Sequence, residues 1–102
     1  MSEKKNYEAI GRYTEALEEA TKAAADLHGL LVDLKRLVDR AIAHAGVHRP
    51  PFRSIFLPNV DAIREKLDEL EGARERLTSL VAEVNSNAEA AGKPKIELVI
   101  ED

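Results

Sequence analysis

Apolar and small residues recur through the first half of the chain at alternating steps of three and four positions. The series continues without a slip through Ile10, Tyr13, Leu17, Ala20, Ala24, Leu27, Leu31, Leu34, Val38, Ala41 and Ala45. This spacing places the side chains along one face of an α-helix. Gly46 and the Pro50–Pro51 pair end the pattern, because glycine favours the left-handed conformation after a helix and proline cannot continue one. The sequence predicts one helix from about residue 3 to residue 45.

A second stripe of the same period begins after Asn59. It runs through Val60, Ile63, Leu67, Leu70, Arg74, Leu77, Val81, Val84, Ala88 and Ala91, and only the arginine interrupts it. Asn59 is a good N-cap residue, and Asp61 places negative charge in the first turn, where the helix dipole favours it. Gly92 and Pro94 follow the last apolar position. We therefore expect a second helix over about 60–91, joined to the first by a bend over 46–59.

Two such helices predict an all-α protein, a long antiparallel two-helix hairpin that resembles a coiled coil. A hairpin of this size buries little apolar surface by itself. The first helix carries additional apolar residues beside its stripe, which favours self-association of two hairpins into a four-helix bundle, a homodimer. The candidate dimer interface consists of Ala16, Ala20, Ala23, Ala24, Leu27, Leu30, Leu31 and Leu37.

The last residues, 92–102, contain the segment KIELVIED, in which apolar and acidic residues alternate up to Val99. Alternation with a period of two is typical of an extended segment or a β-strand. We expect a short extended tail or strand, and a lone strand needs a partner. The candidates for pairing with a partner's sheet edge are Ile96, Leu98 and Ile100.

The bend holds both phenylalanines and three of the four prolines of the chain. It is longer than the two to eight residues that usually join antiparallel helices. Two interpretations stay open: the bend seals the end of the bundle, or it forms a surface that grips another protein. The candidate partner-binding residues are Arg49, Phe52, Arg53, Ile55, Phe56 and Leu57.

The formal net charge is −4, which argues against nucleic-acid binding over the whole surface. Residues 33–53 nevertheless carry five Lys or Arg against two Asp, a local balance of +3. A basic bend is compatible with a solvated helix face, with an acidic protein partner, or with contact to a nucleic-acid backbone. The chain contains no groove-entering motif that would favour the last of these.

Chemistry that would indicate an enzyme is missing from the sequence. Without cysteine, there is no thiolate, disulfide or cysteine-based metal site. The carboxylate pairs of EALE (Glu15, Glu18) and EKLD (Glu65, Asp68) fall on outer heptad positions, whereas metal ligands must converge. His44 and His48 are separated by the helix-ending glycine. We therefore expect no catalysis, no cofactor and no metal.

The sequence also shows no apolar signal core and no run of the ~18 apolar residues that a membrane span requires. A cytoplasmic protein without membrane contact is the expectation. The leading hypothesis is a non-enzymatic interaction or assembly protein, such as an adaptor, a small chaperone or a subunit of an oligomer. The alternative is a small accessory factor that contacts nucleic acid through its basic bend.

Overall fold

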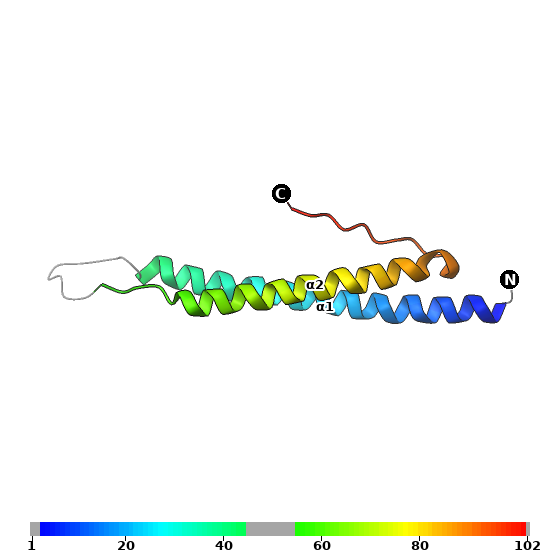
Figure 1. Cartoon of the computed structure of the whole chain (residues 1–102), viewed down its shortest axis with the longest axis horizontal. Coiled ribbons are helices and arrows are strands. Elements are labelled where there is room, and N and C mark those ends of the chain that lie inside the picture. The colour runs from blue at the N-terminus through cyan, green and yellow to red at the C-terminus, as the bar shows by residue number, and fades with distance from the viewer. Residues whose placement is uncertain (1–2, 45–54, 102) are drawn as a thin grey trace.

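The structure, a computed structural model, describes residues 3–44 and 55–101 of the chain. Helix α1 spans Glu3–His44 and helix α2 spans Val60–Ala91. The two helices pack against each other in opposite directions, so that the N-terminus and the end of α2 lie at the same end of a rod (Figure 1). The principal extents of the molecule are 79 × 21 × 14 Å. The prediction of an all-α, two-helix hairpin is confirmed.

Both ends of α2 are capped as the sequence predicts. The side-chain oxygen of Asn59 accepts a hydrogen bond of 3.0 Å from the backbone N–H of Ala62. Gly92 lies in the left-handed region with φ = 67°, and the following N–H, that of Lys93, donates to the carbonyl of Ala88 at 2.9 Å. This bond satisfies a carbonyl that the end of the helix would otherwise leave without a partner, and it turns the chain back along the hairpin.

The buried core lies in the half of the hairpin that contains the termini, which we call the terminus-side half. Alanines from both helices form most of this core, and its larger members are Tyr13 of α1 and Leu80 and Val84 of α2. The core cluster consists of Ala9, Tyr13, Ala16, Ala20, Ala23, Leu80, Val84, Ala88 and Ala91. In the other, bend-side half, the residues between the helices are only half-buried, among them Leu30, Leu34, Leu37, Ile63 and Leu70. Packing is therefore unequal along the rod.

The interface between the helices, which we call the seam, includes only part of the predicted stripe of α1. Ala9, Ala16 and Ala23 are buried, whereas Ala24 and the next residue of that row, Leu31, are exposed. The reason is steric, because alanine side chains let two helices approach more closely than leucine side chains do. The hairpin thus also uses a row beside the predicted stripe. Of the stripe row that contains Ala24 and Leu31, Ile10 and Leu17 pack against the core, whereas Ala24, Leu31 and Val38 are exposed.

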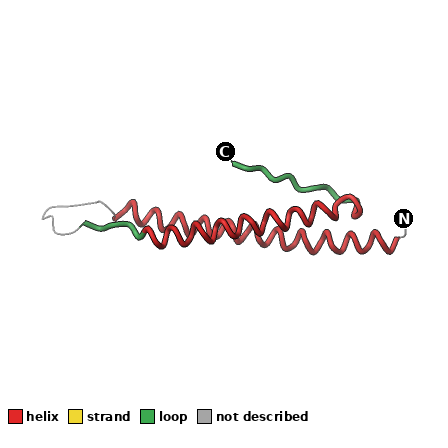
Figure 2. Tube along the Cα trace, viewed as in Figure 1, coloured by secondary structure: helices red, strands yellow, loops and turns green. Residues whose placement is uncertain are grey.

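Residues 93–101 follow Gly92 as a loop that runs back toward the middle of the rod (Figure 2). We call this segment the tail. It is neither helical nor paired as a β-strand. The expected extended tail is therefore present, while pairing of Ile96, Leu98 and Ile100 with a sheet edge stays a prediction.

Candidate interaction surface

A row of apolar residues lies beside the seam on each helix. In α1, each member follows a seam residue by one position, as Leu31 follows Leu30 and Val38 follows Leu37. In α2 the same relation holds for Leu67, which follows Lys66, and for Val81, which follows Leu80. Successive side chains of an α-helix point in directions about 100° apart around its axis. Because the helices run in opposite directions, this turn leads to the same side of the hairpin in both, and the two rows form one apolar face.

The tail covers this face in the terminus-side half. Val81 is only 4% exposed, whereas Leu67, two heptads earlier in the same row, is 48% exposed. One turn after Val81, the side chain of Asn85 binds the tail, and Ile96 of the tail packs against the core. The buried part of this face therefore lies next to the attachment of the tail, and its exposed part does not.

Three hydrogen bonds hold the base of the tail to both helices. The hydroxyl of Tyr13 on α1 donates to the carbonyl oxygen of Pro94 at 3.0 Å. The amide of Asn85 on α2 donates through Nδ2 to the carbonyl of Ile96 at 2.9 Å and accepts through Oδ1 from the N–H of Ile96 at 2.7 Å. This pair of hydrogen bonds, one donated and one accepted, is the pattern that a residue of a neighbouring β-strand would offer to Ile96. The tail is thus fixed without a sheet.

This attachment was not predicted from the sequence. Tyr13 was assigned to the apolar stripe only, and Asn85 was not singled out. One signal was available, since Asn85 follows the core residue Val84 directly and is itself only half exposed. A half-buried amide needs hydrogen-bond partners, and an extended segment supplies them.

Beyond its attachment the tail stands away from the helices and leaves a groove. The groove has a volume of about 790 Å³ and ends at the middle of α2. It is lined by Leu27 of α1, by Glu71, Arg74, Glu75, Leu77, Thr78 and Ser79 of α2, and by Leu98, Val99, Ile100 and Glu101 of the tail. Leu98, Val99 and Ile100 are all exposed, so the distal tail offers apolar surface that the hairpin itself does not cover.

In the bend-side half the apolar face is uncovered. Four large apolar side chains there are exposed, and we refer to them together as the open face: Leu31, Val38, Val60 and Leu67. A contiguous exposed group of large apolar side chains on a small protein is typical of a contact surface. Helical spacing also places Lys35 and Arg64 directly beside these residues.

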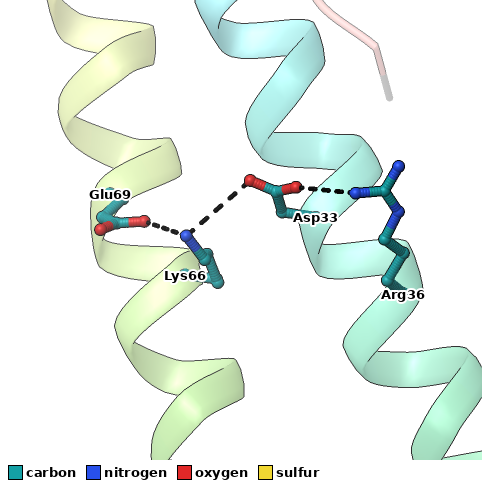
Figure 3. Close-up of polar contacts among 4 residues, drawn as sticks. All are labelled: Asp33, Arg36, Lys66 and Glu69. Atoms are coloured by element: carbon teal, nitrogen blue, oxygen red, sulfur yellow. Dashed lines mark hydrogen bonds and ion pairs between the residues drawn. The ribbon is translucent and has the colours of Figure 1, made fainter.

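Asp33 and Glu69 each follow a residue of the open face by two positions and therefore point to the other side of the hairpin, and Figure 3 shows the polar contacts around them. Asp33 of α1 lies 3.9 Å from Nζ of Lys66 on α2, and Lys66 also binds Glu69 at 3.0 Å. Arg36 joins the group through Asp33 at 3.6 Å. The hydrogen bond and the charge of Glu69 raise the pKa of Lys66 above its ordinary value. Water-exposed ion pairs of this kind suit a side that stays in solvent.

The chemistry of the described residues is otherwise sparse. Glu15, Glu18, Glu65 and Asp68 are exposed, as their outer heptad positions predict. Within residues 3–44 and 55–101, no three His, Asp or Glu side chains come together as a metal site. Neither helix in this part of the chain has the length and apolar character needed to cross a bilayer. No protein-family model, curated protein or solved structure matches the chain.

Next to the bend there is a second, smaller cleft of about 460 Å³. It is lined by Leu37, Arg40, Ala41 and His44 of α1 and by Phe56, Leu57, Pro58 and Asn59 before α2. Of the predicted partner-binding residues, Ile55, Phe56 and Leu57 are exposed. The other three, Arg49, Phe52 and Arg53, lie outside the described residues. The cleft therefore brings two of the predicted residues together with Arg40 and His44.

The residues predicted for a dimer interface divide into two groups in the structure. Ala16, Ala20 and Ala23 are buried within the hairpin, and Leu27, Leu30 and Leu37 are half-buried in or beside the seam. Ala24 and Leu31 are exposed on the apolar face. In the first group, the three alanines pack against α2, while the three leucines keep part of their surface accessible. Dimerisation through these residues stays a prediction, and the open face is the most exposed apolar surface beside them.

Proposed function

We propose that this chain is a non-enzymatic assembly protein that works by helix-to-helix association, with a second copy of itself as its first partner. The open face is the observation that supports this function. It places four large apolar side chains on one side of the bend-side half, while the side behind it carries the Asp33–Lys66–Glu69 ion pairs. Two hairpins joined through such faces form a four-helix bundle, the usual way for paired helices to bury a second apolar row.

The hairpin itself gives a physical reason for a partner. Its bend-side half contains only half-buried apolar residues at the seam, so few side chains there are removed from water. Burial of apolar area contributes roughly 25 cal/mol per Å². A second copy over the open face would bury both this face and the half-exposed seam beneath it. Association therefore stabilises the part of the rod that packs least well.

The bend cleft is the second surface in this proposal. Phe56 and Leu57 supply exposed apolar surface there, and Arg40 and His44 supply polar and cationic groups. A cleft with this lining suits an apolar side chain next to a carboxylate on another protein. The alternative of nucleic-acid contact depends on Arg49 and Arg53, outside the described residues, and no described feature favours it.

Sedimentation equilibrium over a wide concentration range tests the proposal. The unchanged chain is expected to sediment as a dimer at micromolar concentration. A Leu31→Lys, Leu67→Lys variant is expected to sediment as a monomer with unchanged helix content, because charges on the open face would have to be buried. The matched control is Ala25→Lys, Ala82→Lys, which adds the same two positive charges at exposed positions away from this face and keeps the dimer. A monomeric mass for the unchanged chain at all concentrations would overturn the proposal.

A further inference from the structure

We infer that the distal tail of each chain, Leu98–Ile100, covers the open face of a second copy. This inference rests on the proposed self-association and adds the element that mediates it. The occupant is a second copy arranged antiparallel to the first about a two-fold axis near the middle of α2. In this arrangement each hairpin contributes its tail to the space between the two apolar faces.

The position of the tail is the first argument. Its base is bonded to the terminus-side half of the hairpin at Asn85, and its last described residue, Glu101, lines the groove with Glu71 and Leu27 near the middle of the rod. A two-fold axis at this point exchanges the two halves of the rod. The tail of the second copy then lies over the bend-side half, where Leu31, Val38, Val60 and Leu67 are uncovered.

The lengths agree with this arrangement. The nine residues of the tail reach at most about 30 Å when extended, at roughly 3.3 Å per residue. Helix α2 has 32 residues, which at 1.5 Å per residue is about 48 Å, so half of it is about 24 Å. One tail thus spans half of the face, and two tails placed end to end span the whole. An isologous pair of this kind is closed, because each copy gives and receives the same segment.

The side chains of the distal tail also fit a contact with a second copy. Val99 is 85% exposed and Ile100 is 72% exposed, so their apolar surface is not used within the hairpin. Glu97 and Glu101 flank the three consecutive apolar residues of the distal tail, and Lys35 and Arg64 lie beside the open face. Apolar residues would meet the open face while the carboxylates approach the two cations, which gives a complementary contact.

Disulfide trapping tests the inference directly, because the chain has no cysteine of its own. In a Leu98→Cys, Leu67→Cys variant, the two positions lie in different halves of one hairpin but meet between two copies. Mild oxidation is expected to convert most of the protein into a covalent dimer on a non-reducing gel. The matched control is Leu98→Cys, Asp68→Cys, in which the second cysteine is one position further and faces away from α1. This control is expected to remain monomeric on the gel.

A second measurement needs no cysteine. Val99→Ser, Ile100→Ser removes apolar surface from exposed positions, so the hairpin keeps its unfolding midpoint at concentrations where it is monomeric. The dissociation constant of the dimer is expected to rise roughly tenfold or more, because the two serines bury much less apolar surface between the copies than valine and isoleucine do. Glu89→Gln, on the exposed last turn of α2, is a control that leaves the dissociation constant unchanged.

The outcomes separate this inference from the proposed function. If the unchanged chain is a dimer but Leu98 and Leu67 do not cross-link, the assembly proposal stands and the exchanged tail is wrong. A cross-linked monomer would show that the tail reaches Leu67 in its own chain, and equal cross-linking of the Asp68 control would show a tail without a fixed position. Either result overturns the inference. A monomer by sedimentation overturns both proposals.

Discussion

Tyr13 and Pro94 are 81 positions apart in the sequence, and the hydroxyl of the first donates a hydrogen bond of 3.0 Å to the carbonyl of the second. The ring of Tyr13 belongs to the buried core between the helices, while its hydroxyl reaches the tail. One residue of the first helix therefore connects the core, the C-terminal cap region and the segment proposed to bind a second copy.

The Tyr13→Phe variant isolates this connection. The ring stays in the core and only the hydroxyl is lost, so we expect a destabilisation of about 0.5–1.5 kcal/mol, the usual net value of one hydrogen bond. Urea unfolding followed by circular dichroism measures it. Amide exchange of Ile96 should accelerate in the same variant, since the tail loses one of its three bonds to the helices. Tyr7→Phe, at an exposed tyrosine of the same helix, is the control and should leave both quantities unchanged.

Two alanines of α1 test where the seam lies. Ala23 is buried between the helices, and Ala25 is exposed. Ala23→Leu forces extra volume into a close contact and is expected to destabilise the fold by about 1–3 kcal/mol. Ala25→Leu should change stability by no more than about 0.5 kcal/mol. Thermal unfolding compares the two variants, and equal effects would contradict the assigned seam.

Two glycines give opposite expectations for the same substitution. Gly92 has φ = 67°, a conformation that alanine adopts only with strain, so Gly92→Ala should destabilise the fold by about 1 kcal/mol. Gly29 lies inside α1, and an added Cβ there meets nothing within 4 Å. Gly29→Ala should therefore stabilise the fold by roughly 0.5–1 kcal/mol, because alanine loses less backbone entropy in a helix. Chemical denaturation of both variants measures the two signs, and a stabilising Gly92→Ala would exclude the left-handed cap.

The ion pairs around Lys66 predict a dependence on alkaline pH. Glu69 raises the pKa of Lys66 in the folded state above the ordinary value of 10.5. A raised pKa means that the stabilisation is complete below pH 10.5 and is lost as pH rises through the folded-state value. Lys66→Met removes this contribution. The difference in unfolding midpoint between the unchanged chain and the variant should therefore stay constant below pH 10.5 and shift in favour of the variant as the pH rises above this value.

The exposed Lys22 provides the control for that experiment. Lys22→Met should follow the unchanged chain across the same pH range, because Lys22 lies on the surface of α1. A parallel loss of stability in all three proteins would mean that general titration of lysines and tyrosines, and not the Lys66 pairs, dominates at high pH.

Much of the fold could be predicted from the sequence because it depends on local signals. The heptad stripe, the Asn59 cap and the Gly92–Pro94 stop each act over a few residues, and they place the helices within one residue of the observed bounds. The choice between two neighbouring apolar rows of α1 could not be predicted in this way. It depends on how closely the helices approach, and the small volume of Ala9, Ala16 and Ala23 decides it only when the partner helix is present.

The attachment of the tail was unpredictable for a related reason. Alternation in KIELVIED indicates an extended segment but not the surface on which it lies. Both Asn85 and Tyr13 look like ordinary helix residues until the turn at Gly92 brings Pro94 and Ile96 next to them. Long-range hydrogen bonds of side chains leave no periodic signal. The open face lies beyond this attachment, since Val81, one turn before Asn85, is buried and Leu67 is exposed.

The unequal packing along the rod has a consequence for how the protein loses its structure. The buried residues are concentrated between Ala9 and Ala23 on α1 and between Leu80 and Ala91 on α2, whereas the bend-side half holds half-buried contacts. In a rod only two helices wide, each turn is supported chiefly by the turns directly across from it, so opening can proceed stepwise along the axis. In a monomeric chain, the helices should therefore separate first at the bend and last at the termini. Val84 lies in the most protected part and should be among the last residues to exchange its amide hydrogen.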